Sequence, residues 1–138
     1  MADDKLINIL LVDDDVVDVK NVERALRKNN VANPLFVAAN GLEALDMLRK
    51  GTVPGPRRLV LLDLNMPKMN GIEFLQEIRK DPELATLSVV VLTTSNDDRD
   101  RVAAYSHNVA GYLLKPVTFA SFVELMAALN KYWSLVEL

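Results

Sequence analysis

Short apolar runs alternate with longer amphipathic segments along the chain. The runs are rich in Val, Leu and Ile, and they comprise Ile9–Val12, Leu35–Ala39, Leu59–Leu62, Val89–Leu92 and Tyr112–Leu114. Continuous apolar runs of this length are typical of strands buried on both faces, as in a parallel sheet covered by helices. The pattern therefore predicts five short parallel strands.

The segments that follow these runs have the hydrophobic period of α-helices. Asn40 precedes Glu43 by three residues, and Asn70 precedes Glu73 in the same way, which is the spacing of a capping box. Thr118 can cap a last helix. The apolar positions that mark the five predicted helices are Val19, Val22 and Leu26, then Leu45 and Leu48, Leu75 and Ile78, Val102 and Tyr105, and finally Phe119, Phe122, Val123, Met126, Leu129 and Trp133. Five alternating strand–helix units predict a doubly wound α/β sandwich.

Composition narrows the class of protein. The 138 residues suffice for one domain, and a chain of this size needs no disulfide or structural metal to fold. The absence of cysteine excludes thiolate chemistry and Cys-ligated zinc, and the single His107 excludes sites built from several histidines. The 16 basic and 19 acidic residues give a net charge of −3, so no general basic field attracts nucleic acid or anionic lipid.

The hydropathy pattern predicts neither a membrane segment nor a secretory one. The apolar runs are far shorter than the ~20 residues that span a bilayer, and the N-terminus is acidic and polar, unlike a signal peptide. We therefore expect a cytoplasmic protein in which residues 1–138 form one domain with no effector domain. Residues 133–138 are expected to form a short C-terminal tail.

Polar residues follow the predicted strands at the points where the strands end. They are Asp13, Asp14 and Asp15 after the first run, Asp63 after the third, Thr93 and Thr94 after the fourth, and Lys115 and Pro116 after the fifth. In open α/β sheets, ligands bind outside the carboxyl ends of the strands, where the strand order reverses. In a sheet of order 2-1-3-4-5 the first and third strands are neighbours. Asp13, Asp14 and Asp63 are then expected to converge on one pocket.

This group of residues predicts a metal-dependent phosphoryl-transfer site. Three carboxylates a few ångströms apart repel one another unless a cation lies among them. Oxygen ligands without His or Cys select a hard divalent ion, and Mg²⁺ suits a site with one or two direct carboxylates, waters and a phosphate. We expect Asp63 to attack phosphorus and become an aspartyl-phosphate, while Lys115 and Thr93 hold phosphoryl oxygens.

Four short motifs in the same order carry a family resemblance. They are Val12-Asp13-Asp14, Leu61 to Pro67 with Asn70-Gly71, Leu92-Thr93, and Gly111-Tyr112-Leu113-Leu114-Lys115-Pro116. Together they resemble the receiver domain of two-component response regulators, from Ile9 to about Tyr132. The resemblance implies the flavodoxin-like form of the (βα)5 sandwich.

The resemblance also implies the roles of the acidic residues. It implies that Asp63 is the phosphoacceptor, that Asp14 binds Mg²⁺ directly and that Asp13 acts mainly through water. Further metal ligands are expected to be Asp63 and the backbone carbonyl of Asn65. Asn65 and Ser95 occupy the positions at which the family tunes the hydrolysis rate, and neither is acidic.

The resemblance also implies a switch pair and a cis peptide bond. Thr93 and Tyr112 look like the coupled switch pair of the family, in which the hydroxyl moves toward the acyl phosphate and the aromatic ring follows. A plain alternative for Tyr112 is a strand aromatic with its hydroxyl in water. The Lys115–Pro116 bond is expected to be cis.

The expected partners follow from the same resemblance. A sensor histidine kinase is expected to supply the phosphoryl group, and a downstream protein is expected to bind in trans, with no nucleic acid and no membrane involved. The chain would catalyse only its own phosphorylation and dephosphorylation. The Pro-containing second loop, Thr93-Thr94-Ser95 and the Tyr132-Trp133 tail look most like stand-alone regulators that partner bacterial phytochrome kinases. The fourth and fifth helices with this tail are predicted to form a homodimer face.

Other interpretations compete with parts of this one. Asp15 is expected to be a helix cap, and His107 is expected to interact with a helix dipole rather than to donate phosphate. A flavodoxin-like electron carrier would need a glycine- and hydroxyl-rich phosphate loop, and an aspartyl-phosphate phosphatase would need an acidic residue where Asn65 stands. The alternative that stays open is a receiver-like adaptor that is not phosphorylated.

Overall fold

Five parallel strands form the centre of the molecule. In the computed structural model, which describes residues 7–28, 34–55, 57–94 and 97–114 with Ala120, Glu124 and Ala127, they form one sheet. The strands are β1 (Asn8–Val12), β2 (Leu35–Ala38), β3 (Arg58–Leu62), β4 (Ser88–Thr93) and β5 (Gly111–Leu114). Their order is β2-β1-β3-β4-β5, and every neighbouring pair is parallel. The predicted sheet is confirmed, with boundaries that differ by one residue.

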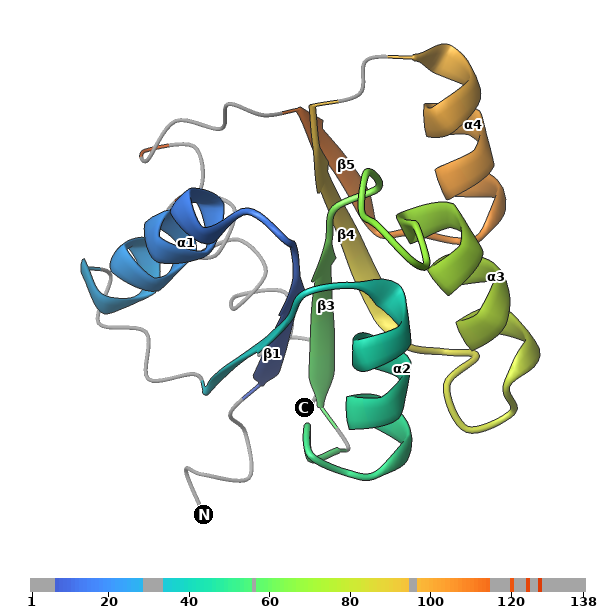
Figure 1. Ribbon diagram of the computed structural model, residues 1–138, viewed down its shortest axis with the longest axis horizontal. Helices are drawn as coiled ribbons and strands as arrows, with labels where there is room; N and C mark the ends of the chain where they lie inside the picture. Colours follow the sequence, from blue (N-terminus) through green and yellow to red (C-terminus); the bar gives the residue numbers. More distant parts are fainter. Residues whose placement is uncertain are drawn as a thin grey trace.

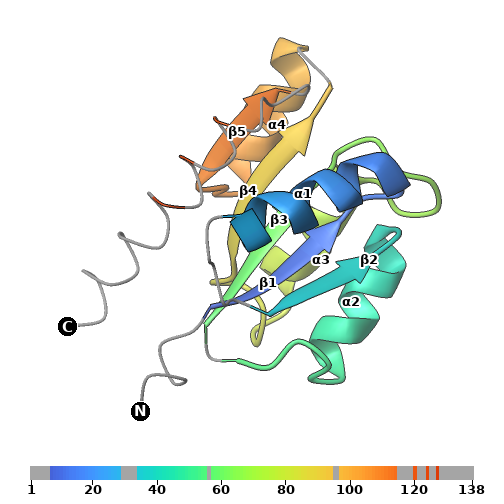
Figure 2. The same ribbon diagram turned by 90° about the vertical axis from the view of Figure 1, so that its left-hand side faces the viewer.

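Helices cover both faces of this sheet. They are α1 (Val16–Lys28), α2 (Gly41–Arg49), α3 (Gly71–Lys80) and α4 (Asp98–Ser106). Helix α1 lies on one face, and α2, α3 and α4 lie on the other (Figures 1 and 2). Within the described ranges, no helix is long and apolar enough to cross a membrane.

The predicted fifth helix is described at three positions. Ala120, Glu124 and Ala127 are helical and exposed, which agrees with a solvent-facing side of a helix. The predicted cap Thr118, the apolar stripe from Phe119 to Trp133 and the tail all lie outside the described residues.

The strands are apolar throughout because both of their faces are covered. One face of the sheet packs against α2 and α3 through a cluster that includes Leu10, Val12, Val60, Leu62, Val89, Val91, Leu45, Phe74, Leu75 and Ile78. The alternate positions Ile9, Leu11, Leu59, Leu61, Val90 and Leu92 are also buried. This two-sided burial explains why the sequence shows continuous apolar runs instead of an alternating pattern.

Capping side chains fix where two helices begin. The Asn70 side chain accepts a hydrogen bond from the Glu73 backbone N–H at 3.0 Å, and the Glu73 carboxylate accepts one from the Asn70 N–H at 3.1 Å, so the predicted capping box is confirmed. Asn40 caps α2 in the same way, through the Glu43 N–H at 2.9 Å. The Glu43 carboxylate, however, reaches one residue further back, to the Ala39 N–H at 3.2 Å.

Helix α4 packs less tightly than its apolar residues suggest. Val102 and Tyr105, which mark its helical period in the sequence, are 67% and 49% exposed. The buried residue of α4 is Ala104. Apolar spacing thus predicts this helix correctly, but the apolar side chains themselves lie largely in solvent.

Arg79 holds the end of α4 against the rest of the fold. Its guanidinium donates to the carbonyls of His107 (2.6 Å), Asn108 (3.1 Å), Leu87 (2.7 Å) and Ala85 (3.1 Å). Burial lowers the pKa of Arg79, yet an arginine remains charged at neutral pH. One side chain at the end of α3 therefore connects the loop before β4 with the loop before β5.

Candidate functional site

Three carboxylates meet at the carboxyl edge of the sheet. Asp13, Asp14 and Asp63 each offer an oxygen atom, and these atoms lie within 4.8 Å of one another. Asp13 and Asp63 are buried, with 3% and 7% of their surface exposed, whereas Asp14 is exposed. The convergence predicted from the ends of the first and third strands is therefore observed.

Strand pairing brings these residues together. Val12 in β1 pairs with Leu62 in β3, so both strands end at the same level. The Asp63 N–H donates to the Val12 carbonyl at 2.9 Å, which continues the ladder by one residue. The Asp13 N–H donates to the Ala38 carbonyl at 3.0 Å, on the other side of β1. The backbone thus fixes both buried aspartates.

Backbone amides orient the two buried carboxylates. The Asp15 N–H donates to Asp13 Oδ1 at 2.9 Å, and the Asn65 N–H donates to Asp63 Oδ1 at 3.1 Å. Asp15 itself caps α1, because its Oδ1 accepts from the N–H groups of Val17 and Asp18 at 2.8 and 3.2 Å. The prediction that Asp15 is a helix cap is confirmed.

Gly71 allows α3 to begin directly beside the acidic cluster. A Cβ atom at this position would lie 2.7 Å from Leu64 Cα and 2.8 Å from the Asp63 carbonyl oxygen. Real Cβ atoms do not approach so closely, so any other residue would push the helix away from the strand end. The Gly71 N–H also donates to the Leu64 carbonyl at 3.0 Å. The two ends of the loop between β3 and α3 are therefore held close together.

Thr93 lies at the end of β4, near the same loop. It is fully buried, and its Oγ1 accepts a hydrogen bond from Asn65 Nδ2 at 3.5 Å. Tyr112 in β5 is also buried, with 8% of its surface exposed, and belongs to the core cluster. The structure therefore places Thr93 in contact with the loop after Asp63, and it places Tyr112 beneath the surface.

Several predicted positions lie outside the described residues. They are Lys115, Pro116, Ser95, Tyr132 and Trp133. The expected roles of Lys115 and Ser95 and the expected cis bond at Pro116 stay predictions. His107 is the C-cap residue of α4, as its predicted place near the end of that helix requires.

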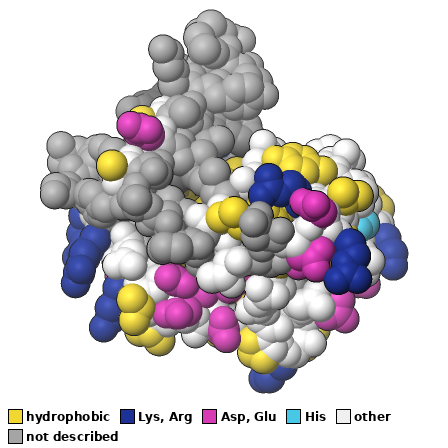
Figure 3. Space-filling model, turned by 90° about the horizontal axis from the view of Figure 1, so that it is seen from above, with side chains coloured by type: hydrophobic (Ala, Val, Ile, Leu, Met, Phe, Trp, Pro, Cys, Tyr) yellow, Lys and Arg dark blue, Asp and Glu magenta, His cyan; other side chains and the backbone are white. Residues whose placement is uncertain are grey.

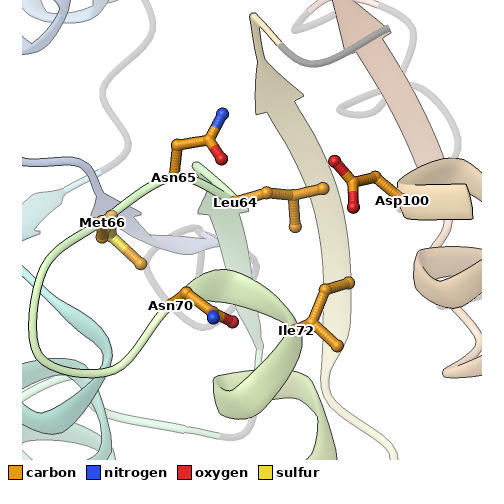
Figure 4. A pocket seen from close by; sticks show the side chains of 6 residues that line it. All are labelled: Leu64, Asn65, Met66, Asn70, Ile72 and Asp100. Atoms are coloured by element: carbon orange, nitrogen blue, oxygen red, sulfur yellow. The ribbon is translucent and has the colours of Figure 1, made fainter. Parts of the chain in front are cut away.

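A pocket of about 420 Å³ lies between the loop after Asp63 and the first turn of α4. Its lining residues are Leu64, Asn65, Met66, Asn70, Ile72 and Asp100. The Asp100 carboxylate points from α4 toward the Leu64 side chain (Figure 4). The start of α4 is thus separated from the loop after Asp63 by open space.

Charged side chains of both signs lie on the described part of this edge. Seen from above, acidic groups and basic groups are interspersed there with apolar side chains (Figure 3). Asp97, the N-cap of α4, hydrogen-bonds to Arg99, and this contact holds the pKa of the Asp97 carboxyl below its ordinary value. The same contact raises the pKa of Arg99.

The chemistry of the acidic cluster fits a hard divalent cation. All three converging side chains offer carboxylate oxygens, two of them from buried positions where like charges are costly without a counter-ion. Oxygen donors of this kind select Mg²⁺ or a related ion over softer metals. The residues present therefore match the predicted cofactor.

Sequence reasoning missed two residues near the site and one at the opposite edge of the sheet. Asp100 faces the pocket, and Arg101 lies over the Tyr112 ring. Arg79, at the far end of α3, holds the loop that follows α4. Charged residues at helix surfaces and ends look solvated in a sequence. For the Arg101 contact, the sequence does offer one signal. Arg101 and Tyr105 are four residues apart, so both lie on one face of the helix and can contact the same neighbour.

Comparisons with known proteins agree with this geometry. Residues 9–129 match the model of the response regulator receiver domain. Response regulator Rcp1 of Synechocystis is 35% identical over 129 residues, which cover 91% of this chain and 87% of Rcp1.

Two solved structures show the same likeness. The phosphorylated cyanobacterial phytochrome response regulator RcpA aligns with a TM-score of 0.79 and 32% identity, covering 93% of this chain and 94% of RcpA. The Mn²⁺-bound form of response regulator Rcp1 aligns with a TM-score of 0.77 and 35% identity, covering 92% and 94% of the two chains. With its sheet order, its acidic metal site and these matches, the chain belongs to the response regulator receiver domain family.

Proposed function

We propose that this chain is a phosphorylation switch in which Asp63 accepts a phosphoryl group from the phosphohistidine of a sensor histidine kinase. The observation that carries the proposal is the convergence of the Asp13, Asp14 and Asp63 carboxylates within 4.8 Å. We assign the nucleophile to Asp63 because the family resemblance implies a phosphoacceptor at this position, at the end of the central strand β3. The Asn65 N–H holds its carboxylate in place.

The transfer is an in-line displacement at phosphorus. An oxygen of the Asp63 carboxylate forms the new P–O bond, the P–N bond to the imidazole breaks, and the imidazole takes a proton as it leaves. Mg²⁺ would be held directly by Asp14 and mainly through water by Asp13, with Asp63 and the Asn65 carbonyl as further ligands. It would neutralise the carboxylate and phosphoryl oxygens. Hydrolysis of the acyl phosphate returns the chain to its first state, so it turns over only its own phosphoryl group.

We assign to the Thr93 and Lys115 side chains the role of binding the phosphoryl oxygens. Thr93 is fully buried beside Asn65, so a hydroxyl shift toward the new acyl phosphate changes the end of β4 and the loop that leads to α4. Tyr112 follows as the second member of the switch pair. The changed surface around α4 then binds a protein partner in trans.

Intact-mass measurement with acetyl phosphate and Mg²⁺ tests the phosphoryl transfer. The wild-type chain is expected to gain one phosphoryl group, whereas Asp63→Asn and a chelator-treated sample gain none. Asp98→Asn, which removes an exposed carboxylate at the start of α4, serves as the matched control and should behave like the wild type. No gain by the wild-type chain would contradict the proposal and favour an adaptor that is not phosphorylated.

A phytochrome-type histidine kinase is the phosphodonor that we propose. The support is the likeness to RcpA, which is described as a phytochrome response regulator. Initial rates of transfer from a phosphorylated phytochrome kinase and from an unrelated kinase can be compared at equal concentrations. We expect the phytochrome kinase to be faster by at least an order of magnitude, and equal rates would contradict this assignment.

A further inference from the structure

Tyr112 is in contact with two side chains of helix α4. The Arg101 guanidinium carbon lies over the Tyr112 ring, 4.9 Å from its centroid. The Tyr105 ring is stacked on the same ring, with 6.4 Å between centroids and 30° between planes. Arg101 and Tyr105 are one helical turn apart, so one face of α4 supplies both contacts.

These contacts link α4 to the strand that carries the proposed switch aromatic. Every residue of α4 is described, and Ala104 is the only one of them that is buried. A pocket lies beside the first turn of the helix, and Arg79 holds the backbone that follows its last turn. The middle of α4 therefore contacts the rest of the fold through the buried Ala104 and through Tyr112.

The strand register puts this ring on the same side of the sheet as Thr93. Tyr112 pairs with Val91 in β4, and Thr93 follows Val91 by two residues. Side chains two residues apart in a strand point to the same face, so the Thr93 hydroxyl and the Tyr112 ring are diagonal neighbours. A movement of the Thr93 side chain therefore changes the space available to the Tyr112 ring.

We propose that Arg101 is a positioning residue of the phosphorylation switch, because its guanidinium, together with the Tyr105 ring, holds Tyr112 buried and ties α4 to β5. The inference rests on the proposed function, and it names a residue that affects the equilibrium between the two states of the switch. A cation over an aromatic face stabilises that ring position, and the effect grows when water is excluded. In the proposed switch, phosphorylation favours the inward position of the ring. Because coupling is reciprocal, a residue that holds the ring inward also favours the phosphorylated state.

Affinity for beryllofluoride with Mg²⁺, a mimic of the phosphoryl group, tests this inference. Arg101→Met removes the charge but keeps the length of the side chain, and it is expected to weaken the affinity by about 2- to 30-fold, the range of cation–π energies. Arg101→Lys should recover part of the loss. The control is Arg99→Met. Arg99 lies in the same helix, but it forms an exposed ion pair with Asp97, so this substitution should leave the affinity unchanged.

A second measurement does not depend on phosphoryl chemistry. Solvent exposure of the Tyr112 ring can be followed by NMR of ¹³C-labelled tyrosine with a soluble paramagnetic agent. Exposure should rise in Arg101→Met and stay unchanged in Arg99→Met. If the wild-type chain binds no mimic, the proposed function fails. If it binds the mimic and Arg101→Met binds equally well or more tightly, or Tyr112 stays equally protected, the inference about Arg101 is overturned.

Discussion

Thr93 shows how one buried hydroxyl can connect a chemical event to a change of surface. It is fully buried, its oxygen accepts from Asn65 Nδ2, and it ends the strand that leads to α4. Asn65 is also the residue whose N–H binds the Asp63 carboxylate. The proposed phosphoacceptor and the proposed switch residue therefore contact the same loop residue.

Replacement of Thr93 is predicted to separate phosphorylation from its structural response. Thr93→Ala should keep most of the phosphorylation of Asp63, because the nucleophile and the carboxylates are unchanged. The phosphorylation-dependent amide shifts of α4, recorded by NMR, should shrink severalfold, since the hydroxyl that follows the acyl phosphate is gone. Thr94→Ala alters the exposed neighbour and should respond like the wild type. Full-sized shifts in Thr93→Ala would refute the switch role.

At the scale of elements, Arg79 stabilises a junction of several segments. Four carbonyl oxygens from the loops before β4 and β5 accept from its guanidinium. Arg79→Met is expected to lower the free energy of unfolding by about 2 kcal/mol, because hydrogen bonds to a charged donor are lost. Urea unfolding measures this change as a lower midpoint at constant slope. The control is Lys80→Met, which removes the next, exposed cation of α3 and should change the midpoint little.

The start of α4 is predicted to be sensitive to acid. Asp97 caps the helix through the Arg99 N–H at 2.8 Å, and its contacts with Arg99 lower the pKa of the carboxyl. A carboxyl whose pKa is lower in the folded than in the unfolded state stabilises the fold above its unfolded pKa, and this contribution is lost as pH falls through the folded pKa. Acidification below about pH 4 should therefore weaken the cap.

An NMR titration of the Asp97 carboxyl carbon measures this effect. The midpoint is expected below the ordinary value of about 3.9 for aspartate. Arg99→Met should raise the midpoint, because it removes the side-chain hydrogen bond and the ion pair at 3.1 Å. Lys80→Met, which removes a charge from α3, should leave the Asp97 midpoint unchanged. An unchanged midpoint in Arg99→Met would argue against this origin of the shift.

For the whole molecule, α4 is the best described part of the predicted dimer surface. Val102 and Tyr105 are exposed there by 67% and 49%, so this helix offers apolar side chains to a partner. The other predicted parts, the apolar stripe of the fifth helix and the tail, lie outside the described residues. The homodimer therefore stays a prediction with partial support.

Light scattering at tens of micromolar concentration tests the dimer. We expect a dimer that Val102→Glu converts to a monomer, because the added charge cannot be buried between two copies. Val17→Glu, which changes an equally exposed valine in α1, should remain dimeric. A monomer in the wild-type chain, both with and without acetyl phosphate, would exclude this face as a homodimer contact.

The order of apolar and polar residues is enough to predict the fold and the position of the acidic cluster. Five apolar runs with helical segments between them allow few arrangements other than a covered parallel sheet, because each strand needs apolar neighbours on both faces. Asp13 and Asp63 directly follow such runs, so the end of the strand fixes their place. Asp15 and Asn70 were predicted as caps because capping depends on local spacing alone.

Features that depend on contacts between distant segments could not be predicted in this way. The contact of Arg101 with Tyr112 joins α4 to β5, and the four acceptors of Arg79 belong to loops that sequence spacing does not bring together. The need for glycine at position 71 appears only when α3 lies against Asp63 and Leu64. The exposure of Val102 and Tyr105 follows from how α4 sits on the sheet. Periodicity identifies a helix and its apolar face, but packing between distant segments decides what covers that face.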